Sequence, residues 1–347
     1  MQKRDLKYLV SYAIPFIAIA SLLLGGIWAF ATVVFAFVVI PLVDLILPVN
    51  SANLSESEET KKNNSSLFDY LLYANVPLQY SILGLFLYTV SFQTLQTYEL
   101  IGFILSMGIC NGVLGINVAH ELGHRVNRFE QTLAKSLLLT SLFMHFFIEH
   151  NRGHHKNVAT PFDPATAKVN QNIYSFFIQT ISGSYLSAWK IQLDLLKKEG
   201  KSFFSLNNSM LNYHLIQLLF VTLIFLVFGS ITLFIYLISA LIGILLLETI
   251  NYIEHYGLLR KINERGVYER VDVIHSWNAN QTFGRIMLYE LTRHSDHHYK
   301  PSRKYQILRN SDRSPQLPTG YPGMMLVSFF PPLFFHLMNN RVKHIND

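Results

Sequence analysis

Residues 202–247 read SFFSLNNSMLNYHLIQLLFVTLIFLVFGSITLFIYLISALIGILLL, a stretch without a single Asp, Glu, Lys or Arg. The hydrocarbon core of a bilayer is about 30 Å thick, so a helix of about 20 apolar residues crosses it. The stretch is long enough for two crossings, and Gly229-Ser230 near its middle is suited to a turn between them. It therefore predicts a helical hairpin in a membrane.

Three further runs lack charged residues: 8–43, 70–98 and 100–120. Only 14% of the 347 residues are charged, whereas soluble domains carry about 25%. We therefore expect one all-α integral membrane domain over residues 1–347, with transmembrane helices at about 7–24, 27–48, 69–93, 98–120, 211–228 and 231–253. Segments 120–201 and 254–347 are expected to form a histidine-rich metal-binding cap on the cytoplasmic side.

The distribution of basic residues predicts this orientation. Lys61-Lys62 follow the second span, Arg125 and Arg128 the fourth, and Arg260-Lys261 the sixth. The opposite turns near 25–26, 94–97 and 229–230 contain no Lys or Arg. By the positive-inside rule both termini and the long polar segments are cytoplasmic. The net charge of +6 is thus explained by topology, and no nucleic-acid partner is expected.

Two other segments are helical in our interpretation. Leu137–Ile148 is free of charge but short, and a crossing there would separate the histidines on either side of it. We therefore predict a buried or re-entrant helix. Within 156–201, the apolar residues Leu186, Trp189, Leu193 and Leu196 share one helical face, which is typical of a helix on a membrane surface or of one that covers the soluble part.

Nine of the 14 histidines fall in four tight groups. The groups are His120 and His124 in NVAHELGHR; His150, His154 and His155 in EHNRGHH; His255 in NYIEHYG; and His294, His297 and His298 in LTRHSDHH. Residues four apart share a helical face, so His120 with His124, His150 with His154, and His294 with His298 are each predicted to hold one ion. The remaining histidines, His145, His214, His275, His336 and His344, are isolated and are not expected to be ligands.

Nine imidazoles exceed what one ion with an open position can hold, whereas two ions with four or five each would fit. Ligation by imidazole alone suits iron, zinc, copper or nickel, and spacing does not choose among them. Four carboxylates adjoin motif histidines and are expected to orient imidazoles through the second ring nitrogen: Glu121, Glu149, Glu254 and Asp296.

The four motifs together resemble those of the bacterial membrane-bound alkane 1-monooxygenases (alkane hydroxylases). The wider group also contains xylene-type monooxygenases and membrane fatty-acid desaturases. The resemblance covers residues 90–325, includes the VATPFDPA sequence at Val158–Ala165, and departs from the family at Arg125, where Lys is usual. The Asn251–Leu258 motif is similar to the one that separates alkane hydroxylases from desaturases.

The resemblance implies an oxygenase of the bacterial inner membrane with two iron ions held by the nine histidines. It would hydroxylate the terminal carbon of an alkane that enters from the bilayer, in a channel that we expect spans three to six to form. Electrons would come from a rubredoxin, reduced in turn by a flavin-dependent reductase. The single cysteine, Cys110, cannot supply a rubredoxin-type centre, so the donor is expected to be a separate protein. Rubredoxins are typically acidic, so Arg125, Arg128 and Arg303 are candidates for contacting it.

Other classes of protein stay open at this point. A related hydroxylase or desaturase could act on xylene-type or acyl substrates. His120-Glu-Leu-Gly-His124 also has the H-E-x-x-H form of a zinc protease, with Glu121 as general base, but that interpretation leaves seven clustered histidines unexplained. A metal transporter would need histidines along a path across the membrane, whereas these are predicted to lie on one side.

Overall fold

The computed structural model describes residues 3–346, and nearly all regular structure in this range is helical. Strand pairing within it is limited to two isolated bridges, Ile262 with Tyr268 and Asn278 with Gln316. The α-helices are α1 (Ala13–Leu24), α2 (Ala31–Val34), α3 (Ile40–Ile46), α4 (Glu56–Asn63), α5 (Leu67–Tyr73), α6 (Asn75–Phe92), α7 (Thr97–Cys110), α8 (Val118–Gly123), α9 (Arg128–Thr140), α10 (Phe146–Glu149), α11 (His155–Asn157), α12 (Ile173–Lys198), α13 (Ser209–His255), α14 (Thr282–Met287), α15 (His294–Tyr299), α16 (Tyr321–Ser328) and α17 (Pro331–Asn346). The 3-10 helices are η1 (Lys3–Tyr12), η2 (Gly26–Phe30), η6 (Val273–His275) and η7 (Tyr305–Ile307), and the π-helical turns are η3 (Phe35–Val39), η4 (Asn111–Asn117) and η5 (His150–His154). The predicted all-α fold is confirmed.

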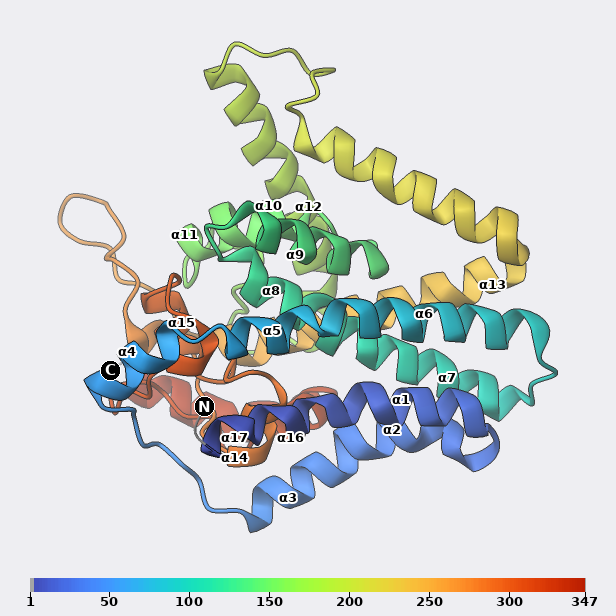
Figure 1. The fold of residues 1–347 in the computed structure, drawn as a ribbon. Helices are drawn as coiled ribbons and strands as arrows, with labels where there is room; N and C mark the ends of the chain where they lie inside the picture. The colour runs from blue at the N-terminus through green and yellow to red at the C-terminus, as the bar shows by residue number, and fades with distance from the viewer. Residues whose placement is uncertain (1–2, 347) are drawn as a thin grey trace.

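The apolar runs form helices of membrane-spanning length. Five helical stretches are long and apolar enough to cross a membrane: Asp5–Leu24, Gly26–Ile46, Leu67–Phe92, Thr97–Gly123 and Ser209–His255. The first four match the first four predicted spans, with ends that differ by a few residues. Figure 1 shows the first four stretches, and the part of the fifth that follows Gly229, running along one bundle, with both termini at the end of the bundle where α15 lies.

The fifth stretch, α13, takes the place of the two last predicted spans. It runs for 47 residues, and at about 1.5 Å per residue a straight helix of this length would be more than twice as long as a bilayer core is thick. Gly229 interrupts it with φ 82° and ψ 175°, a conformation that L-residues rarely adopt. Figure 1 shows the chain turning back here, so that the yellow arm before Gly229 and the gold arm after it form a hairpin. The bend therefore lies where the sequence places the turn.

The prediction of one helix over Leu137–Ile148 is wrong in shape, although most of the segment is buried. Helix α9 ends at Thr140, and α10 begins only at Phe146. The hydroxyl of Tyr236 donates to the carbonyl of Thr140 at 2.9 Å, which satisfies a carbonyl that a continuing helix would have used. Leu142 then adopts a positive φ of 54°. The resulting turn redirects the chain so that the second histidine motif meets the first.

The segment around Trp189 is helical as predicted, within α12 (Ile173–Lys198). Its buried face is a row of mostly small or polar residues, Thr180, Ser184, Ala188 and Gln192. Leu186 is 65% exposed, so part of the predicted apolar face points away from the protein. Contact of α12 with a membrane surface stays a prediction.

The bend in α13 supports a first test. Gly229→Ala should lower the free energy of unfolding by about 1–3 kcal/mol, because alanine is strained at this φ although space for its methyl group exists. Gly84→Ala is the matched control, since Gly84 also faces open space but lies in regular helix α6, where alanine should be neutral or stabilising. Thermal unfolding in detergent measures both. Equal midpoints for the two variants would contradict a strained bend at Gly229.

Candidate metal centre

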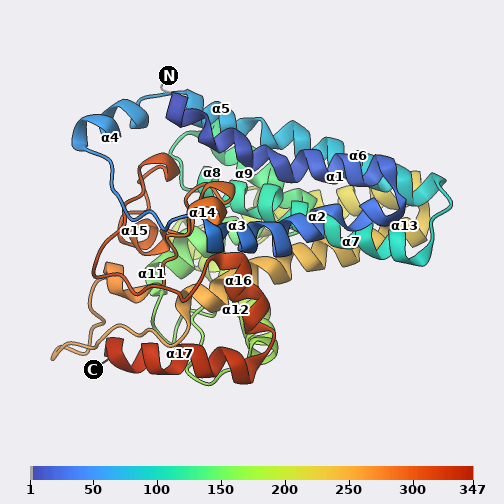
Figure 2. The same ribbon diagram turned by 90° about the horizontal axis from the view of Figure 1, so that it is seen from below.

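The four histidine motifs come together at one end of the bundle. His120 and His124 lie in and just after α8, and His255 is the last residue of α13. The second motif occupies η5 and α11, and the third occupies α15. Figures 1 and 2 both show α8, α11 and α15 close together at this end. Helices that end at one depth thus bring distant parts of the sequence to one place.

The structure divides the nine histidines into two groups. Within each group, one ligand atom per residue lies within 4.8 Å of all the others. The five-histidine group contains His120, His124, His150, His155 and His297; the four-histidine group contains His154, His255, His294 and His298. All nine predicted candidates are present, and within the described residues none of the five isolated histidines belongs to either group. A division into sets of five and four is what two neighbouring ions would need.

The spacing of the ring nitrogens fits bound cations. Nε2 of His150 lies 3.1 Å from Nε2 of His124 and 3.0 Å from Nε2 of His155. An imidazole nitrogen lies about 2.0–2.1 Å from a zinc ion, so two nitrogens at a right angle about such an ion are about 3 Å apart. A neutral imidazole carries one N–H, so protons alone leave lone pairs facing each other in a cluster of this kind. The donor set therefore fits metal ions.

Burial favours the neutral form of several of these imidazoles, which is the form that binds metal. Burial lowers the pKa of His150, His155 and His297 far below the ordinary value of histidine. Burial likewise lowers the pKa of His124 to about 3. His154 differs: burial lowers its pKa, but the carboxylate of Asp163 outweighs this and raises it above the ordinary value.

The predicted pairing of His150 with His154 is wrong, because these residues lie in a π-helical turn and not in an α-helix. In a π-helix the residue five positions on completes the turn. His150 therefore shares its group with His155, and His154 faces the four-histidine group, where its Nε2 is 3.2 Å from Nε2 of His298. The pairs His120–His124 and His294–His298 fall within single groups as predicted.

The carboxylate predictions differ from the structure in most cases. Glu121 accepts hydrogen bonds from Arg125 and from the backbone N–H of Tyr305, and Asp296 accepts from Arg303 and the backbone N–H of Arg309. Each therefore fixes a loop and not an imidazole. Glu149 contacts Ser187, and Glu254 approaches the inner nitrogen of His294 and not its outer one.

The residue that sequence reasoning missed is Asp163. Its carboxylate lies 3.0 Å from Nδ1 of His154, the outer ring nitrogen, and it also accepts a hydrogen bond from Thr166. Such a contact fixes the orientation of a metal-binding imidazole. Asp163 lies in the VATPFDPA sequence that carries part of the family resemblance, and this was the available signal.

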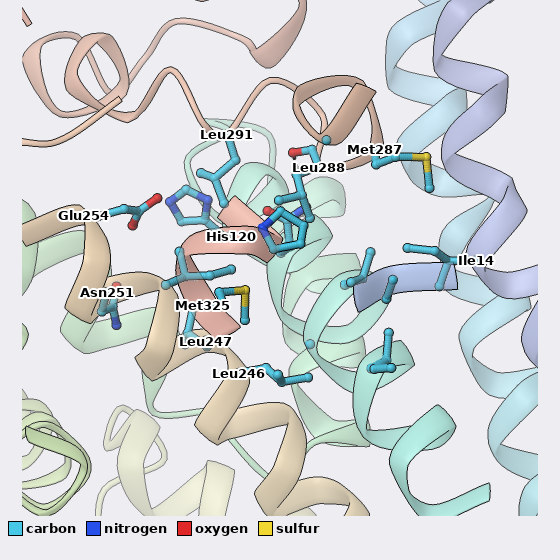
Figure 3. Close-up of a pocket in the computed structure, with 18 of the residues that line it drawn as sticks. Ile14, His120, Leu246, Leu247, Asn251, Glu254, Met287, Leu288, Leu291 and Met325 are labelled. Carbon is cyan, nitrogen blue, oxygen red and sulfur yellow. Dashed lines mark hydrogen bonds between the residues drawn. The ribbon is translucent and has the colours of Figure 1, made fainter. Parts of the chain in front are cut away.

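An apolar cavity reaches the histidines, and His120, His150 and His294 are among its lining residues. Figure 3 shows Glu254 and His120 at one end of it, with Ile14 and Leu246 farther along its walls. The prediction that spans three to six form the channel holds for spans four and six, which line the cavity, and is wrong for spans three and five. The walls come from α1, η3, α3, α7, η4, α8, α10, η5, the second arm of α13 and the segment 284–325, and within the described residues neither Leu67–Phe92 nor the first arm of α13 contributes. The second arm of α13 packs against α7, whereas Figure 1 shows the first arm diverging from the bundle.

Comparison with known proteins agrees with this site. A model of the fatty acid desaturase family matches residues 98–327. Alkane 1-monooxygenase 1 of Alcanivorax borkumensis is 40% identical, over 91% of this chain and 78% of that protein. Alkane 1-monooxygenase of Pseudomonas putida is 39% identical, over 88% of this chain and 75% of its own length. The hydroxylase component of xylene/toluene monooxygenase from Pseudomonas putida is 28% identical over 94% and 86%. The chain belongs to the fatty acid desaturase family of histidine-rich membrane proteins and, within it, to the alkane 1-monooxygenases.

The division into two groups can be tested with paired substitutions. His150→Ala with His155→Ala removes donors from the five-histidine group alone and should spare the ion in the other group. His150→Ala with His154→Ala removes one donor from each group and should weaken both sites. Metal content after dialysis against a chelator measures this, with the exposed His344→Ala as control. The same pattern of loss in both double variants would contradict the grouping.

Proposed function

We propose that this protein is a di-iron monooxygenase that hydroxylates the terminal carbon of alkanes. The reaction would be R–CH3 + O2 + two electrons + two protons giving R–CH2OH + H2O. The observation that best supports this proposal is the apolar cavity that ends at the two groups of imidazoles. Iron suits both an imidazole donor set and the chemistry of oxygen, and the bound ions would supply the reductive activation of O2.

The chain's own residues would bind and position the substrate. Leu246, Leu247, Ile250 and Met325 are among the apolar wall residues of the cavity. Each methylene group that leaves water for such a wall contributes about 0.8 kcal/mol. The same walls exclude water, and the polar lining residues at the metal end would leave the end of the alkane facing the ions.

A separate rubredoxin, reduced by a flavin-dependent reductase, is the proposed electron donor. Two of the three arginines expected to contact it are poorly placed to do so. Arg125 is buried and paired with Glu121 and Asp69, and the side chain of Arg303 is 13% exposed and paired with Asp296. Arg128 is exposed, so a docking surface for an acidic donor would include it.

We further propose that the protein lies in a bacterial inner membrane, with six crossings, and with both termini and the metal centre in the cytoplasm. The support is the placement of Lys and Arg along the sequence, together with the position of both termini at the metal end of the bundle. The alkane would then enter the cavity from the bilayer, in which it dissolves.

The similarity to a xylene/toluene monooxygenase component keeps a second substrate class in view, and acyl chains are a third. A zinc protease is disfavoured, because His120 and His124 share their group with three further imidazoles. A metal transporter is disfavoured as well, because the histidines gather at one end of the bundle.

The proposed activity is tested with purified protein in detergent, supplied with rubredoxin, its reductase, NAD(P)H and dodecane. We expect two irons per chain and 1-dodecanol as the main product, identified by gas chromatography. Iron without alkanol would redirect the assay to xylenes and acyl chains. Zinc in place of iron would overturn the proposal.

The size of the cavity should set the preferred chain length. Leu246→Phe should shift the optimum to shorter alkanes and Leu246→Ala to longer ones, by about fourfold in kcat/KM for each methylene gained or lost. Leu226→Ala, on the exposed face of the other arm of α13, is the control and should leave the profile unchanged. An unaltered profile in the Leu246 variants would rule out this cavity as the substrate site.

A further inference from the structure

One buried carboxylate at the metal end of the cavity lacks a complete set of partners. Glu254 is 1% exposed, and within the described residues its Oε1 has no hydrogen-bond partner of ordinary geometry; the nearby hydroxyl of Tyr321 is the protein group that approaches the carboxylate. Nearby buried carboxylates are better satisfied: Asp163 contacts His154 and Thr166, and Glu248 accepts from Thr180 and Asn251. An unpaired carboxylate oxygen in an apolar surrounding is destabilising unless a partner compensates it.

The position of Glu254 indicates which partner is missing. Its Oε2 lies 3.1 Å from Nε2 of His294. That nitrogen is the one that faces the group, since it lies 3.2 Å from Nε2 of His255 and 2.9 Å from Nε2 of His298. A carboxylate that merely orients an imidazole contacts the outer nitrogen, as Asp163 does with His154. Oε2 of Glu254 instead lies about as far from Nε2 of His294 as the imidazole nitrogens of this group lie from one another.

The number of imidazoles in each group also indicates that the four-histidine group lacks one donor. One group has five imidazoles and the other has four, so one more donor would make them equal. A divalent ion among neutral imidazoles is also a buried net charge, and a carboxylate in contact with it lowers the cost of that burial. Glu254 lines the cavity beside the group, which leaves its carboxyl room to rotate toward the ion. Figure 3 shows this side chain reaching into the cavity from the end of α13.

We propose that Glu254 is a protein ligand of the ion held by the four-histidine group, so that each ion has five protein donors. The inference rests on the proposed function for the identity of the ion as iron. It adds an oxygen donor to a set of nine nitrogens, and it places this donor on the side of the ion that faces the substrate cavity.

The test uses the full chain in detergent, loaded anaerobically with ferrous iron alone. Mössbauer spectroscopy should resolve two ferrous components in the wild type. Glu254→Gln, which keeps the size of the side chain but removes the anionic donor, should change one component and leave the other intact. Release of iron to a chelator should then become faster in one phase, by at least about tenfold.

Glu248→Gln is the matched control, because Glu248 is a buried carboxylate on the same helix whose partners are Thr180 and Asn251. It should leave both components and both release phases as in the wild type. Unchanged spectra and release in Glu254→Gln would overturn the inference, as would an equal effect of Glu248→Gln. A wild-type chain that binds no pair of irons would overturn the proposed function itself, and this is seen before any variant is compared.

Discussion

The crowding of nine imidazoles, seven of them buried and two half-buried, is the constraint that the rest of the structure accommodates. Inner nitrogens in both groups lie between 2.9 and 3.2 Å from a neighbouring one, in surroundings that keep rings such as that of His150 neutral. Without cations between them these contacts would be repulsive or unsatisfied, so metal binding and folding of this region are coupled. The long helices exist in part to meet this constraint. They end at one depth, and small residues such as Gly243, where a Cβ would lie 2.5 Å from that of Asn111, let α13 approach η4 closely enough for their histidine-bearing ends to meet.

A second network holds the third motif in place. Tyr289 and Glu290, shortly before His294, both have positive φ, at 52° and 60°. Such conformations cost about 1–3 kcal/mol each and persist where surrounding contacts compensate them. Asn75 donates to the hydroxyl of Tyr289, and Lys7 forms an ion pair with Glu290.

The charge of Glu290 is strongly favoured. Burial raises its pKa, but Arg285 and Lys7 outweigh this and lower it to about 2. The start of the first span is thereby tied to the loop that carries the third motif, although the two are far apart in sequence. The N-terminal spans thus contribute to the site without supplying a ligand.

Much of this could be predicted from the sequence, because the strongest signals are local. Charge-free runs predict helices, and histidines at fixed spacing indicate candidate ligands such as His120 and His124. The position of the bend at Gly229 can also be predicted from the sequence. The failures share a cause: they depend on geometry that a regular helix does not have. The π-helical turn at His150–His154 changes which imidazoles share a group, and the turn after Thr140 depends on Tyr236, a residue about a hundred positions away. Both Asp163 and Glu121 lie close to motif histidines in the sequence. Only the folded structure shows that Asp163 contacts an imidazole, whereas Glu121 contacts an arginine.

An alkane offers no polar group for recognition, so under the proposed function the selection of its terminal carbon would come from the shape of the cavity. The polar lining residues lie at the metal end of the cavity and include His120, His150, His294 and Glu254. The remaining walls are largely apolar. A chain that enters such a cavity lengthwise presents its methyl end to the metal site first. Under the proposed function, the terminal carbon is thus selected because the metal site lies at the end of the cavity. The same geometry would present the methyl group of a methylated aromatic ring, which gives a physical basis for the kinship with the hydroxylase component of a xylene/toluene monooxygenase. On this view related substrates differ in how they fill the apolar walls, and the ligands that surround the ions can stay the same.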